Sequence, residues 1–413
     1  MSDFSIFNPK KSEKSDENQD AGGLQFHVDH PDPGIRRVRR RRARLFRTFS
    51  LRYFDFLLVF LIVTLNIIGI LAIGSAEPEY QSRQITGMIA SLVVMMLAAG
   101  MDYRRILHFG WFYYFVAIAA LLAVRFMGDT GGGAQRWVTI GPLRFQPSEM
   151  AKVLLILFYA FFINKYKERI RTAPVTLMGI ALIVPALILV ISQPDLSTTI
   201  MIFIIFCVIM FVGGINWKLV VGVLVVSIPS VAVLFNMILQ DTEGKIIDTY
   251  QRNRILAWIY PDQYQDSYAY QTINSVMAIG SGRLLGKGYN TNEISSLLNS
   301  GYISESQTDF IFAVIGEEFG FLGTCIVVLL VFLIALRILR IAMKASDVSG
   351  RVIAAGMAAW IGFQGFMNIA VAVGLIPNTG IPLPFVSYGL TSLLSLYLGV
   401  GFVLNVYMQS RKR

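Results

Sequence analysis

The chain has 413 residues, of which 55% are hydrophobic and 15% are charged, and its formal net charge is +10. A soluble domain could not bury this much apolar surface, and stretches of about twenty apolar residues recur along the chain. These properties exclude a soluble enzyme and predict an all-α, polytopic membrane protein. Both cysteines, Cys207 and Cys325, lie inside apolar stretches, so we expect no disulfide framework.

The N-terminal segment differs from the rest of the chain. Its first fifty residues are polar, which predicts no cleavable signal peptide, and residues 1–34 have the composition of a disordered segment. An arginine-rich run follows at residues 36–44. Such a run can bind nucleic acid, but directly before the first apolar stretch we expect it to fix a cytoplasmic N-terminus and to contact anionic membrane lipids. We therefore predict a disordered basic tail over residues 1–50 and a transmembrane domain over 51–413, with no nucleic-acid partner.

The apolar stretches of the second part predict about ten transmembrane helices. Their approximate bounds are residues 54–75, 84–100, 106–126, 148–164, 174–192, 198–214, 217–239, 308–336, 352–373 and 383–407. When the N-terminus is placed inside, the basic residues of the connecting loops gather on the cytoplasmic side. An even number of spans also places the C-terminus inside.

The predicted outer side of the membrane receives four connections: residues 127–147, 193–197, 240–307 and 374–382. The segment 240–307 is far longer than an ordinary connection, so we expect it to be functional. Within this segment Ala269, Ile273, Val276 and Met277 follow helical spacing. The spacing fits a helix lying on the outer leaflet and equally a helix packed on the bundle.

Asp309 is the first candidate for a functional residue. It lies at the mouth of the predicted eighth span, where a carboxylate is costly unless something pairs with it or uses it. The alternative is that Thr308 or Asp309 only caps the helix that follows. The other three outer connections end in similar helix starts, and the positive ends of these helices could converge beneath an anionic head group.

Other charged residues on the predicted outer side form a second group of candidates. Glu149 and Lys152 are three residues apart, so they share one face at the start of the fourth span. They either neutralise each other or line a cavity. Arg136, Arg252 and Arg254 lie in outer loops, where positive charge is usually scarce. Each arginine either binds an anionic substrate or extends to lipid head groups.

Residues 280–288 are glycine-rich and superficially similar to a P-loop. They lack the first glycine at the required spacing and the Ser or Thr after Lys287, and they lie on the side away from ATP. We interpret this segment as a flexible turn with two cations. Of these, Lys287 joins the candidate substrate-binding residues.

Several of these motifs together resemble the SEDS family, the FtsW/RodA/SpoVE group. They occur in the family's order over most of residues 54–407, at residues 133–137, 145–152, 193–196, 278–282, 308–314, 317–320 and 382–389. The resemblance implies a ten-helix peptidoglycan glycosyltransferase that acts on lipid II at the outer face of the bacterial cytoplasmic membrane. It also implies a class B penicillin-binding protein as the partner that supplies crosslinks.

The resemblance assigns roles to individual residues of this chain. Asp309 matches the catalytic aspartate. The remaining candidates match functional positions of the cavity and basic positions of the outer loop: Arg136, Glu149, Lys152, Arg252 and Arg254. The chain departs from the family pattern at three positions, because Gln307 replaces a usual His, Ser197 a usual Gly, and Leu390 the second Gly of its motif. The change at Gln307 removes a neighbour that would tune the pKa of Asp309.

The expected reaction is an inverting glycosyl transfer. A sugar hydroxyl of the acceptor attacks an anomeric carbon whose leaving group is a polyprenyl pyrophosphate, with Asp309 as the general base. Arginine or lysine side chains, or a divalent cation (Mg²⁺ or Mn²⁺) held by Asp309, stabilise the departing pyrophosphate.

Two rival functions stay open at this point: a flippase for the lipid-linked precursor, and a non-catalytic scaffold for a transpeptidase. The branch of the family is open as well. Residues 193–195 favour the elongation (RodA) type, whereas residues 316–320 suit the division or sporulation types.

Overall fold

The computed structural model of the chain describes residues 51–411, apart from 132–133, 141–142, 292–295, 299, 304 and most of 217–248. The predicted tail over residues 1–50 lies outside the described residues. Most of the predicted seventh span, about 217–239, does so too.

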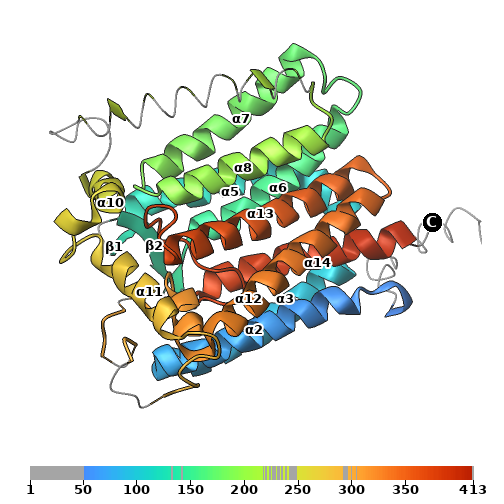
Figure 1. Ribbon diagram of the computed structural model, residues 1–413. Coiled ribbons are helices and arrows are strands. Elements are labelled where there is room, and N and C mark those ends of the chain that lie inside the picture. The colour runs from blue at the N-terminus through green and yellow to red at the C-terminus, as the bar shows by residue number, and fades with distance from the viewer. Residues whose placement is uncertain are drawn as a thin grey trace, which may run out of the picture. The chain divides into compact units, whose positions relative to one another are not determined.

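The described residues form a bundle of helices that run side by side (Figure 1). Eight helical segments are long and apolar enough to cross a membrane: α2 (Phe56–Ala76), α3 (Pro78–Gly100), α4 to α5 (Tyr103–Met127), α6 (Pro147–Lys165), α7 (Ala173–Ile191), α12 (Ile311–Lys344), α13 (Val348–Ala372) and α14 (Leu390–Arg411). A shorter apolar helix, α8 (Leu196–Val212), corresponds to the sixth predicted span. The prediction of an all-α polytopic membrane protein is therefore confirmed.

The helices begin where capping chemistry predicts. Asp55, Asp195 and Asp347 each accept a hydrogen bond from a backbone N–H in the first turn of α2, α8 and α13. Proline stands in the first turn of α3, α6 and α7, where its missing N–H costs no hydrogen bond.

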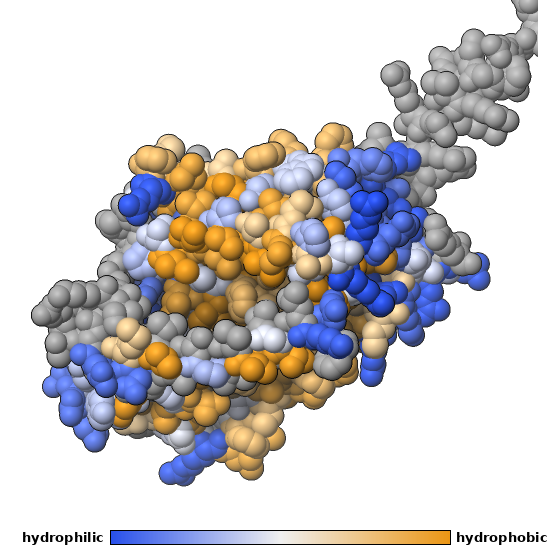
Figure 2. All heavy atoms as spheres, turned by 90° about the horizontal axis from the view of Figure 1, so that it is seen from above, coloured by the Kyte–Doolittle hydropathy of each residue, from blue (hydrophilic) through white to orange (hydrophobic). Residues whose placement is uncertain are grey.

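Burial separates central helices from peripheral ones. The most apolar 18-residue windows of α6, α13 and α14 are 78% buried, whereas that of α4 to α5 is 28% buried. The peripheral helices therefore present apolar side chains outward, as membrane contact requires. The face drawn in Figure 2 is apolar in its middle and hydrophilic toward its ends.

The predicted loop over residues 127–147 contains a small antiparallel sheet instead of irregular structure. Its strands are β1 (Asp129–Gly131), β2 (Ala134–Ile140) and β3 (Leu143–Phe145), in the order β1-β2-β3. In the second pairing Val138 lies opposite Phe145, and Val138 is buried. The sheet fixes the backbone that carries Arg136.

The long outer connection contains α10 (Thr249–Ile259) and α11 (Tyr270–Ser281). The predicted helix around Ala269–Met277 is thus present as α11, and it packs on the bundle. Ser275 Oγ donates to the carbonyl of Ala372 at 2.7 Å, and Ser275 is fully buried. The packed helix, one of the two alternatives, is the observed one.

The last helix starts later than its apolar pattern predicts. The pattern predicts the tenth span from residue 383, but α14 begins at Leu390. Two prolines, Pro382 and Pro384, and the positive φ of Phe385 (64°) are incompatible with a helix here. The eighth span, α12, is also longer than predicted and contains a non-helical residue, Gly320, with φ 63°.

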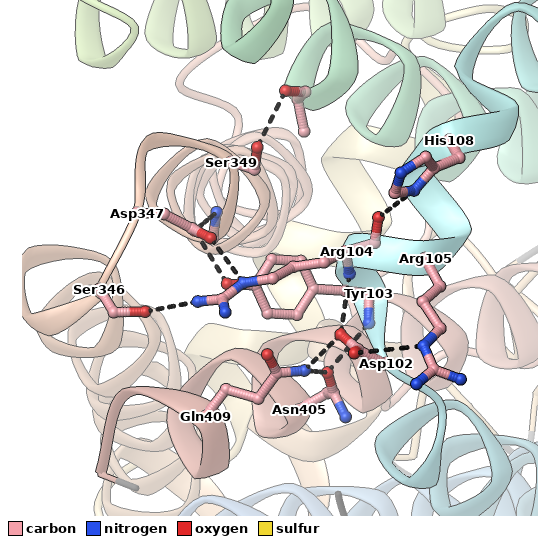
Figure 3. Close-up of polar contacts among 12 residues, drawn as sticks. Asp102, Tyr103, Arg104, Arg105, His108, Ser346, Asp347, Ser349, Asn405 and Gln409 are labelled. Atoms are coloured by element: carbon pink, nitrogen blue, oxygen red, sulfur yellow. Dashed lines mark hydrogen bonds and ion pairs between the residues drawn. The ribbon is translucent and has the colours of Figure 1, made fainter. Parts of the chain in front are cut away.

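At the end of the bundle where α12 leads into α13, polar side chains join three parts of the chain (Figure 3). Arg104 Nε lies 2.9 Å from Asp347 Oδ2, and the Tyr103 hydroxyl donates to Asp347 Oδ1 at 2.8 Å. Gln409 Nε2 donates to both Asp102 and Asn405 at 2.8 Å. We call these residues the Asp347 network. It ties the α3–α5 connection to the start of α13 and to α14.

Candidate active site

Asp309 lies in the turn directly before α12, outside the membrane helices, and is partly buried. The capping alternative is wrong, because the N-cap of α12 is Phe310 and no side chain caps this helix. The Thr308 hydroxyl bonds to Glu305 instead. The Asp309 carboxyl group is therefore not used to start the helix.

Two arginines meet Asp309 around Gly380. A Cβ placed on Gly380 would lie 3.3 Å from Asp309 Oδ2, 3.5 Å from Arg254 Nη1 and 3.9 Å from Arg136 Nη1. Gly380 has φ 67°, a conformation that disfavours other residues. The three charged groups come from β2, α10 and the turn before α12. The structure thus brings together three candidates that are far apart in the sequence.

The environment of Asp309 raises the pKa of its carboxyl group to about 6, chiefly because burial disfavours the charged form. Arg254 and Arg136 lower this pKa, whereas Glu305 and Asp195 raise it. A carboxyl group that titrates near neutral pH can take up a proton during a reaction and release it afterwards.

Arg136 is held by the start of α8. It donates to the carbonyl of Pro194, and its Nε lies 3.7 Å from Asp195 Oδ2. This Nε is buried and has no hydrogen-bond partner in the described part of the chain. Pro194 and Asp195 therefore fix the position of the Arg136 guanidinium group.

Glu149 and Lys152 form a fully buried pair at the start of α6, with Lys152 Nζ 2.8 Å from Glu149 Oε1. Lys152 Nζ also donates to Gln364 Oε1 at 3.0 Å and lies 4.5 Å from the centre of the Trp360 ring. The other carboxylate oxygen of Glu149 has no hydrogen-bond partner among the described residues. The predicted shared face is confirmed, and α13 supplies the polar and aromatic neighbours Gln364 and Trp360.

The two remaining candidates lie on the long outer connection. Lys287 Nζ is 2.8 Å from Glu317 Oε1, and the buried Glu317 also accepts from the backbone N–H groups of Leu297 and Leu298. This pair fastens the outer connection to α12, and a substrate contact by Lys287 stays a prediction. Arg252 is two residues from Arg254 on α10, so the two side chains leave different faces of the helix.

The divalent cation that the sequence predicts at Asp309 stays a prediction. Within the described ranges, no group of three or more His, Cys, Asp or Glu side chains could hold one. The positive charges nearest to Asp309 belong to arginines. We therefore derive no chemical step through a metal.

Sequence reasoning missed several residues at this site. The sequence indicates Asp195 only as part of a helix start, yet it faces Arg136. Gln364 and Asn368 are absent from the predicted candidates, although two amides one turn apart inside an apolar span are themselves unusual. Gly380 gives no sequence pattern, because its importance arises from a turn that brings remote segments together.

Comparison with known proteins gives consistent results. The family model described as "cell cycle protein" (FtsW/RodA/SpoVE) matches residues 44–412. The peptidoglycan glycosyltransferase MrdB of Escherichia coli K12 is 35% identical over 366 residues, which cover 86% of this chain and 94% of MrdB. A probable peptidoglycan glycosyltransferase FtsW of Trichlorobacter lovleyi is 30% identical over 374 residues, covering 87% and 94%.

Solved structures show the same fold. A chain from the study "Structural coordination of polymerization and crosslinking by a peptidoglycan synthase complex" superposes with a TM-score of 0.70 at 28% identity, covering 87% of this chain and 99% of that one. The rod shape determining protein RodA of Thermus thermophilus gives a TM-score of 0.62 at 28% identity, covering 86% and 96%.

Proposed function

Because this chain belongs to the FtsW/RodA/SpoVE family, we propose that it is a peptidoglycan glycosyltransferase that polymerises lipid II into glycan strands. The observation that carries the proposal is the meeting of Asp309 with Arg136 and Arg254 around Gly380. A base with a raised pKa beside two cations suits a reaction in which a hydroxyl loses a proton and a pyrophosphate departs.

In this mechanism Asp309 accepts the proton of the attacking sugar hydroxyl as the new glycosidic bond forms. The bond from the anomeric carbon to the pyrophosphate breaks, and the pyrophosphate leaves as an anion that needs no strong acid. Arg136 and Arg254 offer N–H donors to its oxygens, and an arginine can bind a phosphate through two parallel hydrogen bonds. The product strand remains on one lipid carrier.

The buried pair on α6 is linked to the connection that carries Gly380 through Gln364. Lys152 is neutralised by Glu149 and bonded to Gln364, which donates to the carbonyl of Pro382 two residues beyond Gly380. We propose that the pair orients the lipid-linked substrate in the membrane part of the cavity. A buried ion pair contributes little to the free energy of folding. A role in substrate binding therefore explains this pair better than stability alone.

The flippase alternative requires a path that opens toward both sides of the membrane. Asp309, Arg136 and Arg254 gather at one end of the bundle, whereas the side chains of the Asp347 network bond to one another at the other end. The observations therefore favour polymerisation. The scaffold alternative gives no reason for a carboxyl group that neither caps a helix nor remains fully solvated.

The proposal includes an orientation and a partner. The Asp309 end faces outward and both termini face the cytoplasm, in agreement with the distribution of basic loops. A class B penicillin-binding protein is the proposed partner, supported by the fold shared with a chain of a complex whose study couples polymerisation and crosslinking. The elongation branch is favoured by the higher identity to MrdB than to FtsW, 35% against 30%.

The direct test uses the purified chain in nanodiscs with lipid II, alone and with its class B partner, and scores glycan strands by gel. Wild-type protein should make strands, and Asp309→Asn should not. A titration with Mg²⁺ or Mn²⁺ against EDTA tests the divalent cation expected from the sequence. Transport of lipid II across a vesicle membrane without polymerisation would overturn the proposal in favour of the flippase.

A further inference from the structure

Residues 373–389 join α13 to α14 without helical structure, although Ile381, Leu383 and Phe385 are buried. We call this stretch the connecting segment. Its carbonyl groups need donors from the protein, because the interior of a membrane supplies none. Side-chain amides on three helices provide them: Asn66 to Phe385, Gln84 to Ser387, Gln364 to Pro382 and Asn368 to Ile381.

The amides hold the connecting segment in a demanding conformation. Phe385 has φ 64°, which is costly for a residue with a side chain and persists only when its surroundings enforce it. Gly69 on α2 leaves room for the segment, since a Cβ there would lie 2.5 Å from the carbonyl oxygen of Val386. The part of the connecting segment around Phe385 and Val386 is therefore held from α2.

Two of the four amides also contact the candidate catalytic groups. Asn368 Nδ2 donates to Ile381 O at 2.7 Å and to the carbonyl of Asp309 at 2.8 Å. Gln364 Nε2 donates to Pro382 O at 2.9 Å, and its Oε1 accepts from Lys152 at 3.0 Å. The two residues are four apart on α13, hence on one face of the helix.

This face of α13 therefore links the Glu149–Lys152 pair to the main chain of Asp309. One turn bonds to Lys152 and the next turn bonds to the Asp309 main chain, while both bond to consecutive carbonyls of the connecting segment. We propose that Gln364 and Asn368 are positioning residues, which fix Asp309 relative to Gly380 and relative to the Glu149–Lys152 pair. This inference rests on the proposed function and names residues that set its geometry.

Asn368 makes the more direct of the two links, because a single amide nitrogen bonds both the Asp309 main chain and the connecting segment. Asn368 is also buried, and its Oδ1 has no hydrogen-bond partner within the described residues, so its two donated bonds are what it contributes. A displacement of about 1 Å at a reacting group can reduce a rate by about 10²-fold.

Asn368→Leu keeps the size of the side chain and removes both bonds. We expect kcat for lipid II polymerisation to fall by about 10²-fold while KM changes by less than about threefold. The acid limb of the pH profile should also move, because Asp309 changes its surroundings. Asn66→Leu is the matched control, since Asn66 donates a similar bond to the same segment at Phe385 and at 2.8 Å. The control should lose stability to a similar extent and keep kcat.

The pair Asn368→Ser and Asn66→Ser covers the case in which the leucine variant does not fold. Wild-type kcat in either Asn368 variant would overturn the proposal, as would equal losses of kcat in the Asn66 and Asn368 variants. Failure of the proposed function is recognised separately: in that case Asp309→Asn itself would polymerise lipid II normally. Loss of activity in Asp309→Asn with full activity in Asn368→Leu would reject only the positioning role.

Discussion

At the Asp347 end of the bundle, aspartate, arginine and amide side chains bond to one another, and none of the atoms in that network is buried without a partner in the described part of the chain (Figure 3). At the Asp309 end and around the Glu149–Lys152 pair, several buried polar atoms have no hydrogen-bond partner in the described part of the chain: Arg136 Nε, Glu149 Oε2, Arg252 Nε, Asn368 Oδ1 and Thr379 Oγ1. Buried polar groups are normally hydrogen-bonded, so unpaired ones call for an explanation.

The difference separates polar residues that serve stability from those that serve a reaction. The Asp347 network contains a helix cap and an ion pair, and several of its bonds join separate elements of the bundle. The Asp309 end combines unpaired donors with a carboxyl group of raised pKa and a left-handed glycine. Buried polar atoms without hydrogen-bond partners and a carboxyl group of perturbed pKa, gathered at one place, are typical of binding and catalytic sites.

The largest expected effect concerns Asp309, the central residue of this comparison. Asp309→Asn should reduce lipid II polymerisation by about 10²–10⁴-fold without preventing folding, because it removes a positioned base. Asp347→Asn is the matched change at the other end. It weakens a cap worth about 0.5–2 kcal/mol, so it should lower the unfolding temperature and keep turnover per folded molecule. Near-normal turnover in Asp309→Asn would show that the two ends do not differ in this way.

The second effect concerns the Glu149–Lys152 pair. Lys152→Met leaves a buried carboxylate uncompensated, which typically costs about 3–5 kcal/mol, so we expect poor folding and little activity. The double variant Glu149→Lys with Lys152→Glu restores charge balance. Recovered stability without recovered strand synthesis would indicate a substrate role, whereas recovery of both would reduce the pair to charge balance like that of the Asp347 network. Thermal unfolding and gel assays measure the two outcomes.

The sequence predicts the helices well and the site in part. Apolar runs and helix caps locate the membrane helices, because a span must satisfy its backbone internally and face lipid. The predicted start of α14 is too early, since apolar content does not report the non-helical path that Pro382 and Phe385 impose. The charged candidates are visible because charge is rare in such a chain.

The residues that position the charged candidates are harder to predict from the sequence. Gly380 and Asp195 matter through contacts with partners more than fifty residues away, and single-sequence patterns contain only local spacing. Gln364 and Asn368 are readable as two amides on one face of an apolar helix, but their acceptors are backbone carbonyls, which no side-chain pattern reveals.

A third, smaller effect tests how Arg136 is held. Lysine keeps the charge but cannot bond the Pro194 carbonyl and an anion through one planar group, so Arg136→Lys should lower kcat/KM for lipid II by about tenfold. Arg104→Lys is the control at the Asp347 end, where a lysine can still pair with Asp347. Equal effects on kcat/KM in both variants would argue against a substrate contact by Arg136. Initial rates in nanodiscs at one fixed ionic strength give the comparison.

The smallest effect is a displacement of the pH profile. Because the carboxylate form of Asp309 is the base and its pKa lies at about 6, kcat/KM should rise between pH 5 and 7 and reach a plateau above that range. Arg254 lowers this pKa, so Arg254→Ala should move the acid limb to higher pH and reduce the rate most at acidic pH.

The control is Arg252→Ala, which removes the same charge from another face of α10 and should leave the acid limb nearer its original position. Since α10 lies on the long outer connection, both variants should be milder than Arg136→Lys on the plateau. An acid limb that moves equally in both variants would mean that the net charge near the site, and not the position of Arg254 beside Gly380, sets the pKa of Asp309.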